Sequence, residues 1–224
     1  MSDVQIAGVQ IAGAHTDVGK TYVACALLRA ARARGLSVSA LKPVVSGFDS
    51  ADWADSDPGL LIAAMGEPLT PERLDAVSPL RFAAPLAPPA AARREGQFLR
   101  LAMLAAYCGP WLAGPAAFKL LETAGGVMSP IAEDGLCVDL MARVPLPVIL
   151  VGGGYLGAIS HTLSALAVLQ RAGLPVAAVA ISESIEPSAP PFAETVASVA
   201  QWSGDVTVVA AGRGQTAWAG ALSL

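Results

Sequence analysis

The sequence predicts an α/β fold in which a parallel sheet is flanked by helices on both faces. Apolar runs of strand length alternate with helical patterns along nearly all of the 224 residues, an order typical of parallel strands joined by right-handed crossovers. Only 14% of the residues are charged and 54% are hydrophobic, as expected where helices cover a sheet on both sides. A chain of this length can bury one large core, so we expect residues 1–224 to form a single domain.

The expected strands are apolar runs bounded by turn residues: Val4–Ala12, Val38–Lys42, Ala116–Glu122, Pro147–Val151, Val176–Ile181 and Val206–Ala210. The expected helices are Lys20–Arg34, Gln97–Leu112, Ser160–Ala172, with Ser160 as a plain N-cap, and Pro191–Trp202. Two stretches, Asp49–Gly59 and Pro79–Ala92, are expected to be loops near the carboxyl ends of strands, where open α/β sheets bind ligands. The pentapeptide VQIAG occurs twice in tandem (Val4–Gly13) and is assigned no function.

Composition and charge argue against several classes of partner. The net charge of −4 gives no general attraction to nucleic acid or to an anionic membrane. Prolines and glycines interrupt the longest uncharged stretch, Arg143–Arg171, which argues against a membrane-spanning helix. The three cysteines are Cys25, Cys108 and Cys137, and their spacing is not that of metal ligands. They are expected to be buried thiols in a reducing cytosol, so we expect a cytoplasmic protein.

A glycine-rich turn, GAHTDVGKT (Gly13–Thr21), lies between the first expected strand and the first expected helix. Backbone N–H groups converge at such a turn, and the positive end of the helix dipole faces it, so the turn can hold phosphate groups. Lys20 is placed to reach the β- and γ-phosphates, and the Thr21 hydroxyl is placed to bind Mg²⁺. The spacing departs from the standard pattern, because Ala14 takes the place of the first glycine. The turn predicts a nucleotide site in a P-loop NTPase-like fold.

Four further motifs follow in order: KPVVSG (Lys42–Gly47), ETAGG (Glu122–Gly126), PVILV (Pro147–Val151) and LGAISHT (Leu156–Thr162). With the glycine-rich turn, they resemble the dethiobiotin synthetases of biotin biosynthesis over nearly the whole chain. The resemblance implies a homodimeric, Mg²⁺- and ATP-dependent ligase that makes dethiobiotin from 7,8-diaminopelargonate and CO₂ or bicarbonate. One amine captures CO₂ as a carbamate, the carbamate oxygen attacks the γ-phosphate of ATP, and the second amine closes the ring and expels phosphate.

The resemblance also assigns roles to individual residues. Lys42 would lie beside the carbamate and the γ-phosphate, where a cation offsets charge on the transferring phosphoryl group. Thr16 and Ser46 would orient the substrate, and Asp17 would either face the diamine or cap the turn. The catalytic set is then Lys42, Lys20 and Thr16, and the substrate-binding set is Ser46, Lys42, Gly157, Ala158 and Ile159. The expected nucleotide contacts are Asp17, Val18, Gly19, Lys20, Thr21, Tyr22, Glu122, Gly125 and Ser182.

The expected Mg²⁺ ligands are Thr21, Asp57 and Glu122. Glu122 is chosen because it ends a strand and is followed by glycines, which allow close backbone approach. The assignment of Asp57 as a ligand rests on the resemblance alone, since the sequence does not choose among the aspartates of Asp49–Gly59. The other aspartates of this segment are expected to be solvated turn residues.

The chain departs from the family pattern at several positions. Thr123 replaces the first glycine of the family's Glu-Gly-Ala-Gly-Gly, and Lys119 interrupts the preceding strand. Ser182 stands where relatives carry an asparagine that reads the adenine edge, and a serine lacks the paired donor and acceptor of an amide. Base preference is therefore open, with ATP as the default. His161 has no partner at metal-ligand spacing and is expected to pack structurally.

Two other functions remain open. A MinD/ParA-type partitioning ATPase shares the fold and a deviant phosphate loop, but it carries a lysine near the start of that loop, where this chain has His15. A nucleotide-binding regulatory protein without activity would account for the changes at Thr123 and Ser182. Phosphate release that needs both the diamine and bicarbonate would distinguish the three.

Overall fold

The computed structural model describes residues 8–222, and within them six parallel strands form one sheet in the order β10-β9-β8-β1-β5-β2. The strands are β1 (Gly8–Gly13), β2 (Val38–Leu41), β5 (Phe118–Glu122), β8 (Val148–Gly152), β9 (Val176–Ser182) and β10 (Val208–Ala211). Each coincides with an expected apolar run, and the predicted fold class is confirmed. Residues 4–7 of the first expected strand, with most of the first VQIAG copy, lie outside the described residues.

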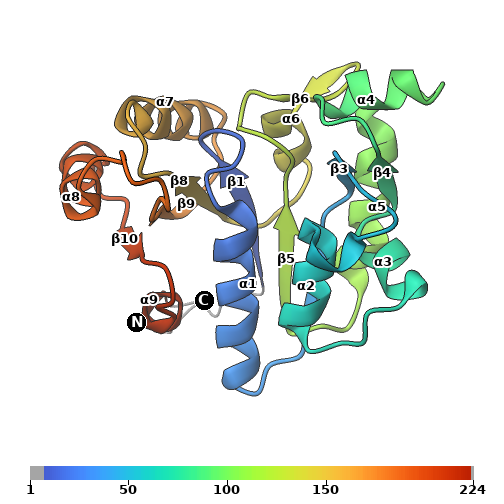
Figure 1. Cartoon of the computed structure of the whole chain (residues 1–224), viewed down its shortest axis with the longest axis horizontal. Coiled ribbons are helices and arrows are strands. Elements are labelled where there is room, and N and C mark those ends of the chain that lie inside the picture. Colours follow the sequence, from blue (N-terminus) through green and yellow to red (C-terminus); the bar gives the residue numbers. More distant parts are fainter. Residues whose placement is uncertain (1–7, 223–224) are drawn as a thin grey trace.

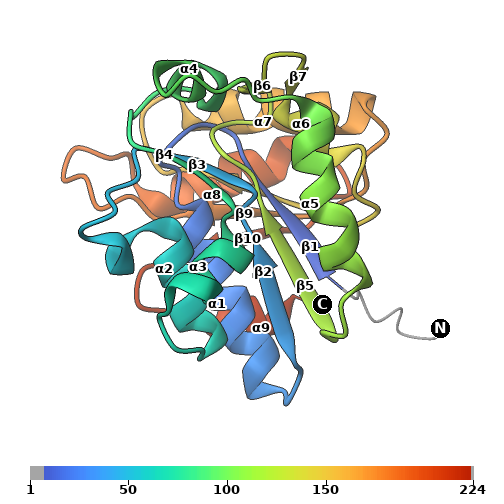
Figure 2. The ribbon, with the colours of Figure 1, turned by 90° about the vertical axis from the view of Figure 1, so that its right-hand side faces the viewer.

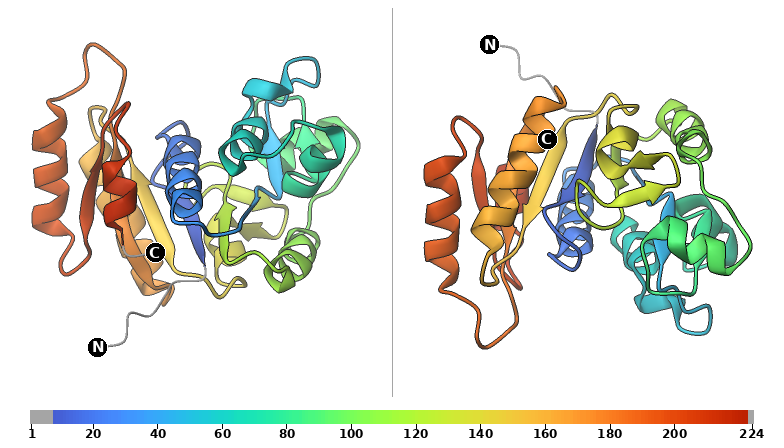
Figure 3. Two further views of the ribbon diagram at one scale, coloured as in Figure 1. Left: turned by 90° about the horizontal axis from the view of Figure 1, so that it is seen from below. Right: turned by 90° about the horizontal axis from the view of Figure 1, so that it is seen from above.

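Helices cover both faces of this sheet (Figures 1 and 2). Helices α1 (Lys20–Ala33), α2 (Asp57–Met65), α3 (Pro71–Val77) and α9 (Ala217–Ala221) pack on one face. Helices α5 (Leu101–Ala113), α6 (Cys137–Met141), α7 (Ala158–Arg171) and α8 (Phe192–Trp202) cover the other. Figure 3 shows α1 and α7 on opposite sides of the sheet.

The alternation of side chains along β8 explains the two layers. Ile149 and Val151 belong to the core beneath α1, whereas Val148 and Leu150 belong to the core beneath α7 and α8. Successive side chains of a strand point to opposite faces, so a strand covered on both sides is apolar throughout. This is why the central strands read as continuous apolar runs in the sequence.

A buried glutamine on β1 fixes the chain that leads from α6 into β8. Gln10 is fully buried, and its Nε2 donates to the carbonyl oxygens of Met141 (3.1 Å), Val144 (2.9 Å) and Leu146 (2.8 Å). Buried carbonyl groups need donors. Gln10 therefore supplies donors to a turn that lies far from it in the sequence.

The two expected loops are partly wrong, because each contains regular structure. Asp49–Gly59 includes the short helix η1 (Trp53–Asp55) and the first turn of α2, which Ser56 caps through its Oγ and the Gly59 N–H (3.4 Å). Pro79–Ala92 includes β4 (Leu80–Phe82) and the start of α4 (Pro88–Arg94). Prolines stand in the first turns of α2 and α4, where the missing N–H has no helical partner to lose. Strand β4 pairs with β3 (Val44–Ser46), and β6 (Pro130–Ala132) with β7 (Gly135–Leu136).

Two helix starts also differ from the prediction. Helix α5 begins at Leu101 rather than Gln97, and the distant Asp134 accepts a hydrogen bond from its first N–H (2.8 Å). Helix α7 begins at Ala158, and its N-cap is Gly157 with φ of 96°, so Ser160 lies inside the helix. Glycine adopts this left-handed conformation more easily than other residues, which explains why the N-cap is Gly157 rather than Ser160. Within residues 8–222, no helix combines the length and apolar character needed to span a bilayer.

Candidate active site

The glycine-rich turn joins β1 to α1 at the carboxyl edge of the sheet. Gly19 is the N-cap of α1 with φ of 91°, and a Cβ there would lie 2.3 Å from Ser182 Oγ, so only glycine fits. Asp17 also has a positive φ, 58°. The first N–H groups of a helix have no acceptor within the helix, so they are available to an anion. The expected phosphate-binding turn thus has the expected position and backbone shape.

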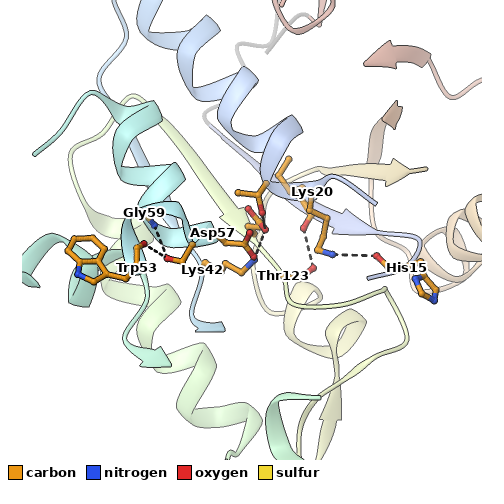
Figure 4. A network of polar contacts seen from close by, with 11 residues as sticks. His15, Lys20, Lys42, Trp53, Asp57, Gly59 and Thr123 are labelled. Atoms are coloured by element: carbon orange, nitrogen blue, oxygen red, sulfur yellow. Dashed lines mark hydrogen bonds and ion pairs between the residues drawn. The ribbon is translucent and has the colours of Figure 1, made fainter. Parts of the chain in front are cut away.

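A network of charged side chains lies beside this turn (Figure 4). Lys42 Nζ donates to Glu122 Oε1 (2.6 Å) and to Asp57 Oδ2, and Thr21 Oγ1 donates to Glu122 Oε1 (2.7 Å). Lys42 follows β2, Asp57 begins α2, and Glu122 ends β5, so separate elements bring them together. Lys42 is 3% exposed and Glu122 fully buried, whereas the Asp57 side chain is 41% exposed.

Each group of the Lys42–Asp57 pair holds the other in its charged form. Burial alone would lower the pKa of Lys42, but Glu122 and Asp57 outweigh it and raise that pKa to about 12. Burial would raise the pKa of Asp57, but the charge and hydrogen bond of Lys42 hold it below its ordinary value. The pair is therefore charged across the neutral range.

Lys20 has the opposite electrostatic environment. Its side chain is 7% exposed, and its Nζ lies 3.4 Å from the carbonyl oxygen of His15 (Figure 4). Burial lowers the pKa of Lys20, and the positive charge of Lys42 lowers it further. Lys20 is thus a buried ammonium group whose charge is poorly compensated, and an anion placed there would stabilise it.

Two cavities open beside the network and share part of their lining. One, of about 310 Å³, is bordered by Lys20 and Lys42, and the other, of about 680 Å³, extends toward Pro85–Pro88 and Pro130. Both are lined by Thr16, Asp17, Ser46, Ala124 and Gly125. A cationic cavity that continues into a partly apolar one can hold an anionic group against a second organic molecule.

Most of the residues predicted for the site gather here. Lys20, Thr21, Lys42 and Asp57 line the smaller cavity, with Gly19 and Tyr22, and Glu122 lies in the network behind them. Val18 and Ser182 instead line a third cavity of about 240 Å³ on the far side of the phosphate turn. Gly157, Ala158 and Ile159 are not among the residues that line these cavities; they lie at the start of α7.

The departures from the family pattern are accommodated without disturbing the network. Thr123 is fully buried, and its Oγ1 donates to the carbonyl oxygen of Ile11 (3.1 Å). Lys119 stays within β5 and donates from Nζ to Ala116 (2.7 Å), so Glu122 still ends the strand. The other aspartates of the Asp49–Gly59 segment, Asp49, Asp52 and Asp55, are exposed, as expected.

Sequence reasoning missed two clusters near the turn. His161, expected to pack structurally, is exposed; Tyr155 OH lies 2.7 Å from its Nδ1, and the His161 ring stacks on the His15 ring with centroids 5.6 Å apart. Arg213 lies over the ring of Tyr22, with Cζ 4.4 Å from the centroid. The sequence around these residues does not predict the contact of His161 with His15 or that of Arg213 with Tyr22, because both pairs are far apart in the chain and meet only in the folded protein.

Comparisons with known proteins separate the functions that the sequence left open. Residues 7–211 match the AAA domain family. The chain is 57% identical over 215 residues to the ATP-dependent dethiobiotin synthetase BioD of Phenylobacterium zucineum (strain HLK1), which covers 95% of this chain and 92% of that one. It is 48% identical over 213 residues to the BioD of Caulobacter vibrioides (strain NA1000 / CB15N), covering 95% of each.

Solved structures agree on the fold alone. The MinC:MinD cell division protein complex of Aquifex aeolicus matches with a TM-score of 0.54 at 9% identity, covering 96% of this chain and 85% of that one. A ParA family ATPase of Chlorobium tepidum TLS matches with a TM-score of 0.53 at 12% identity, covering 92% and 84%. At such low identity the partitioning ATPases share the architecture without supporting a shared function. The chain therefore belongs to the ATP-dependent dethiobiotin synthetases, ligases of biotin biosynthesis, built here on an AAA domain.

Proposed function

We propose that residues 1–224 act as one catalytic domain that joins 7,8-diaminopelargonate to CO₂ with ATP, with Lys42 as the central cation. The observation that carries this proposal is the buried network of Lys42, Glu122 and Thr21 beside the smaller cavity, which shares part of its lining with the larger one. Such a fixed charge can stabilise a transferring phosphoryl group without reorganisation during the reaction.

The triphosphate would lie across the start of α1. Backbone N–H groups from Val18 to Tyr22 would hold it, and Lys20 would contact the β- and γ-phosphates. The lowered pKa of Lys20, caused first by burial and then by Lys42, supports this role, because a bound phosphate would supply compensating negative charge. The γ-phosphate end would then face Lys42 and Glu122.

Thr21, Asp57 and Glu122 would hold Mg²⁺. Glu122 is fully buried, and its Oε2 has no hydrogen-bond partner among the described residues, so an acceptor is left for a cation. Carboxylate and hydroxyl oxygens suit Mg²⁺, although the described residues contain no cluster of three or more His, Cys, Asp or Glu side chains. Bound Mg²⁺ would neutralise charge on the β- and γ-phosphates.

The diamine would occupy the larger cavity. One amine nitrogen attacks CO₂ and loses a proton to give the carbamate, and a carbamate oxygen attacks the γ-phosphorus, releasing ADP. The second amine then attacks the carbonyl carbon of this carbamic–phosphoric anhydride and loses a proton, so that phosphate leaves and the ring closes. Thr16 and Ser46 line the cavity where they can orient the diamine, and Asp17 can face an amine. Positioning and fixed charge account for this chemistry without a covalent enzyme intermediate.

We also propose a cytoplasmic homodimer. The three cysteines are free and buried, as suits a reducing compartment. Gly157, Ala158 and Ile159 do not line the cavities of their own protomer, and the neighbouring Leu156 is 90% exposed. Both observations fit a role for this helix start across a subunit interface, where its N–H groups would hold the substrate carboxylate.

The proposal is tested by phosphate release with ATP, diamine and bicarbonate, each omitted in turn. We expect release only with all three. Lys42→Ala should lower turnover by about 100-fold or more. Lys119→Ala, which removes a lysine of the same sheet outside the cavities, should change it little. Hydrolysis that does not need the diamine, or near-normal turnover of Lys42→Ala, would contradict the proposal.

A further inference from the structure

Arg213, in the turn after β10, is held more firmly than exposed arginines usually are. Its backbone N–H donates to Glu183 Oε2 (2.7 Å), and its Nε donates to the Glu183 carbonyl oxygen (3.0 Å). Its guanidinium lies over the Tyr22 ring, and the Tyr22 hydroxyl donates to the Gly212 carbonyl oxygen (2.5 Å). The residue is exposed, and it lines a cavity beside the phosphate turn. The result is a fixed, flat, positively charged platform.

The platform lies where the nucleoside end of the nucleotide must lie. The proposed γ-phosphate position is beside Lys42 and Glu122, over β2 and β5, on one side of β1. The nucleoside therefore extends to the other side, where β8, β9 and β10 end. An Arg213 terminal nitrogen comes within 3.8 Å of the position of a Cβ on Gly19, in the phosphate turn itself.

The cavity beside this platform, of about 240 Å³, is lined by Val18, Ser182, Glu183 and Arg213. Ser182 is 2% exposed, and its Oγ has no hydrogen-bond partner in the part of the chain that the structure describes. A single hydroxyl cannot match the paired donor and acceptor of a base edge. Ser182 thus gives the cavity less edge recognition than an asparagine would, and Arg213 gives it a stacking surface.

We propose that the nucleotide base stacks on the face of the Arg213 guanidinium turned away from Tyr22, so that the enzyme accepts ATP, GTP and CTP without the strong discrimination of a site that reads one base edge. Guanidinium groups stack on planar rings, and stacking tolerates any base because every base has a π-face. Strong discrimination, on the order of 10⁴-fold or more, comes from sites built to hydrogen-bond one particular edge. This inference rests on the proposed phosphate site.

The test measures kcat/KM for ATP, GTP and CTP in diamine-dependent phosphate release. For the unaltered enzyme we expect the three values to lie within about 100-fold of one another. Arg213→Ala should raise KM for all three nucleotides by on the order of 10-fold, with kcat little changed. Arg213→Lys should lose as much as Arg213→Ala, because a lysine keeps the charge but not the flat face. Arg171→Ala, at the C-terminal end of α7, is the matched control and should behave as the unaltered enzyme.

Inorganic tripolyphosphate separates contact with the base from contact with phosphate. Its inhibition constant should be the same for the unaltered enzyme and for Arg213→Ala. Preference for ATP beyond about 100-fold, an unchanged KM in Arg213→Ala, rescue by Arg213→Lys, or weakened tripolyphosphate inhibition would each overturn the inference. Failure of tripolyphosphate to compete with ATP in the unaltered enzyme would refute the phosphate site itself, and the inference with it.

Discussion

Lys42→Met should lower the free energy of unfolding of the empty enzyme by about 3 kcal/mol, because it removes the cation shared by two carboxylates. Glu122 would remain fully buried without a positive partner, close to Asp57. The rise in the pKa of Lys42 from 10.5 to about 12 corresponds to about 2 kcal/mol in favour of the charged form in the folded protein. Breaking a buried pair costs about 3–5 kcal/mol, and the exposure of Asp57 (41%) places the expected value at the lower end.

Urea unfolding near neutral pH, followed by tryptophan fluorescence, measures this loss. The folded pKa of Lys42 lies above the unfolded value of 10.5, so its stabilisation is fully present below pH 10.5 and disappears as the pH rises through about 12. Lys119→Met is the matched control, because it removes a lysine whose one side-chain hydrogen bond within residues 8–222 goes to the Ala116 carbonyl oxygen. Its expected cost is about 1 kcal/mol. Added Mg²⁺ should restore part of the stability of Lys42→Met. Equal unfolding free energies for the two variants would refute the reasoning.

Three further predictions concern buried polar groups. Burial lowers the pKa of Lys20, so below pH 10.5 its charged form lowers the free energy of unfolding. Lys20→Met should therefore unfold at an equal or higher urea concentration near neutral pH, while losing nucleotide binding. A clear loss of stability would contradict this. Gln10→Ala removes the Nε2 donor from three carbonyl groups, and although those of Met141 and Val144 still accept from backbone N–H groups, that of Leu146 loses its donor. The free energy of unfolding in urea should therefore fall by about 1–3 kcal/mol, and an unchanged midpoint would show that the donor is dispensable. Burial raises the pKa of Cys25 and Cys137 to about 12 and that of Cys108 to about 11. A thiol reagent at mildly alkaline pH should therefore label none of the three in the native protein and all of them in urea. Rapid labelling of the native protein would contradict their burial.

The central sheet could be predicted because its strands are apolar on both faces and end at turn residues. The first turn of α2 was less visible, since Asp57 follows three other aspartates that resemble a solvated loop. A usable signal was present: Ser56 followed by Asp57-Pro58 is a capping residue before a proline in the first turn. The start of α5 had no such local signal, because its first N–H is satisfied by Asp134, 33 residues away.

The chemistry of the site was only partly local. The phosphate turn is a contiguous motif, so Lys20 and Thr21 follow from sequence. Glu122 could be proposed because it ends a strand at the ligand-binding edge of the sheet, whereas the role of Lys42, just past another strand, came from the resemblance to the family. Their direct contact, at 2.6 Å, depends on β2 and β5 being neighbours, which no local pattern states. The Arg213 platform likewise requires the turn after β10 to meet the first turn of α1.

The position of β1 inside the sheet has an evolutionary consequence. Strands on one side of it supply Lys42 and Glu122, and strands on the other lead to Ser182 and Arg213. Substitutions at the β9–β10 end therefore leave Lys42 and Glu122 in place, so a lineage can alter the proposed base site without altering the charged network.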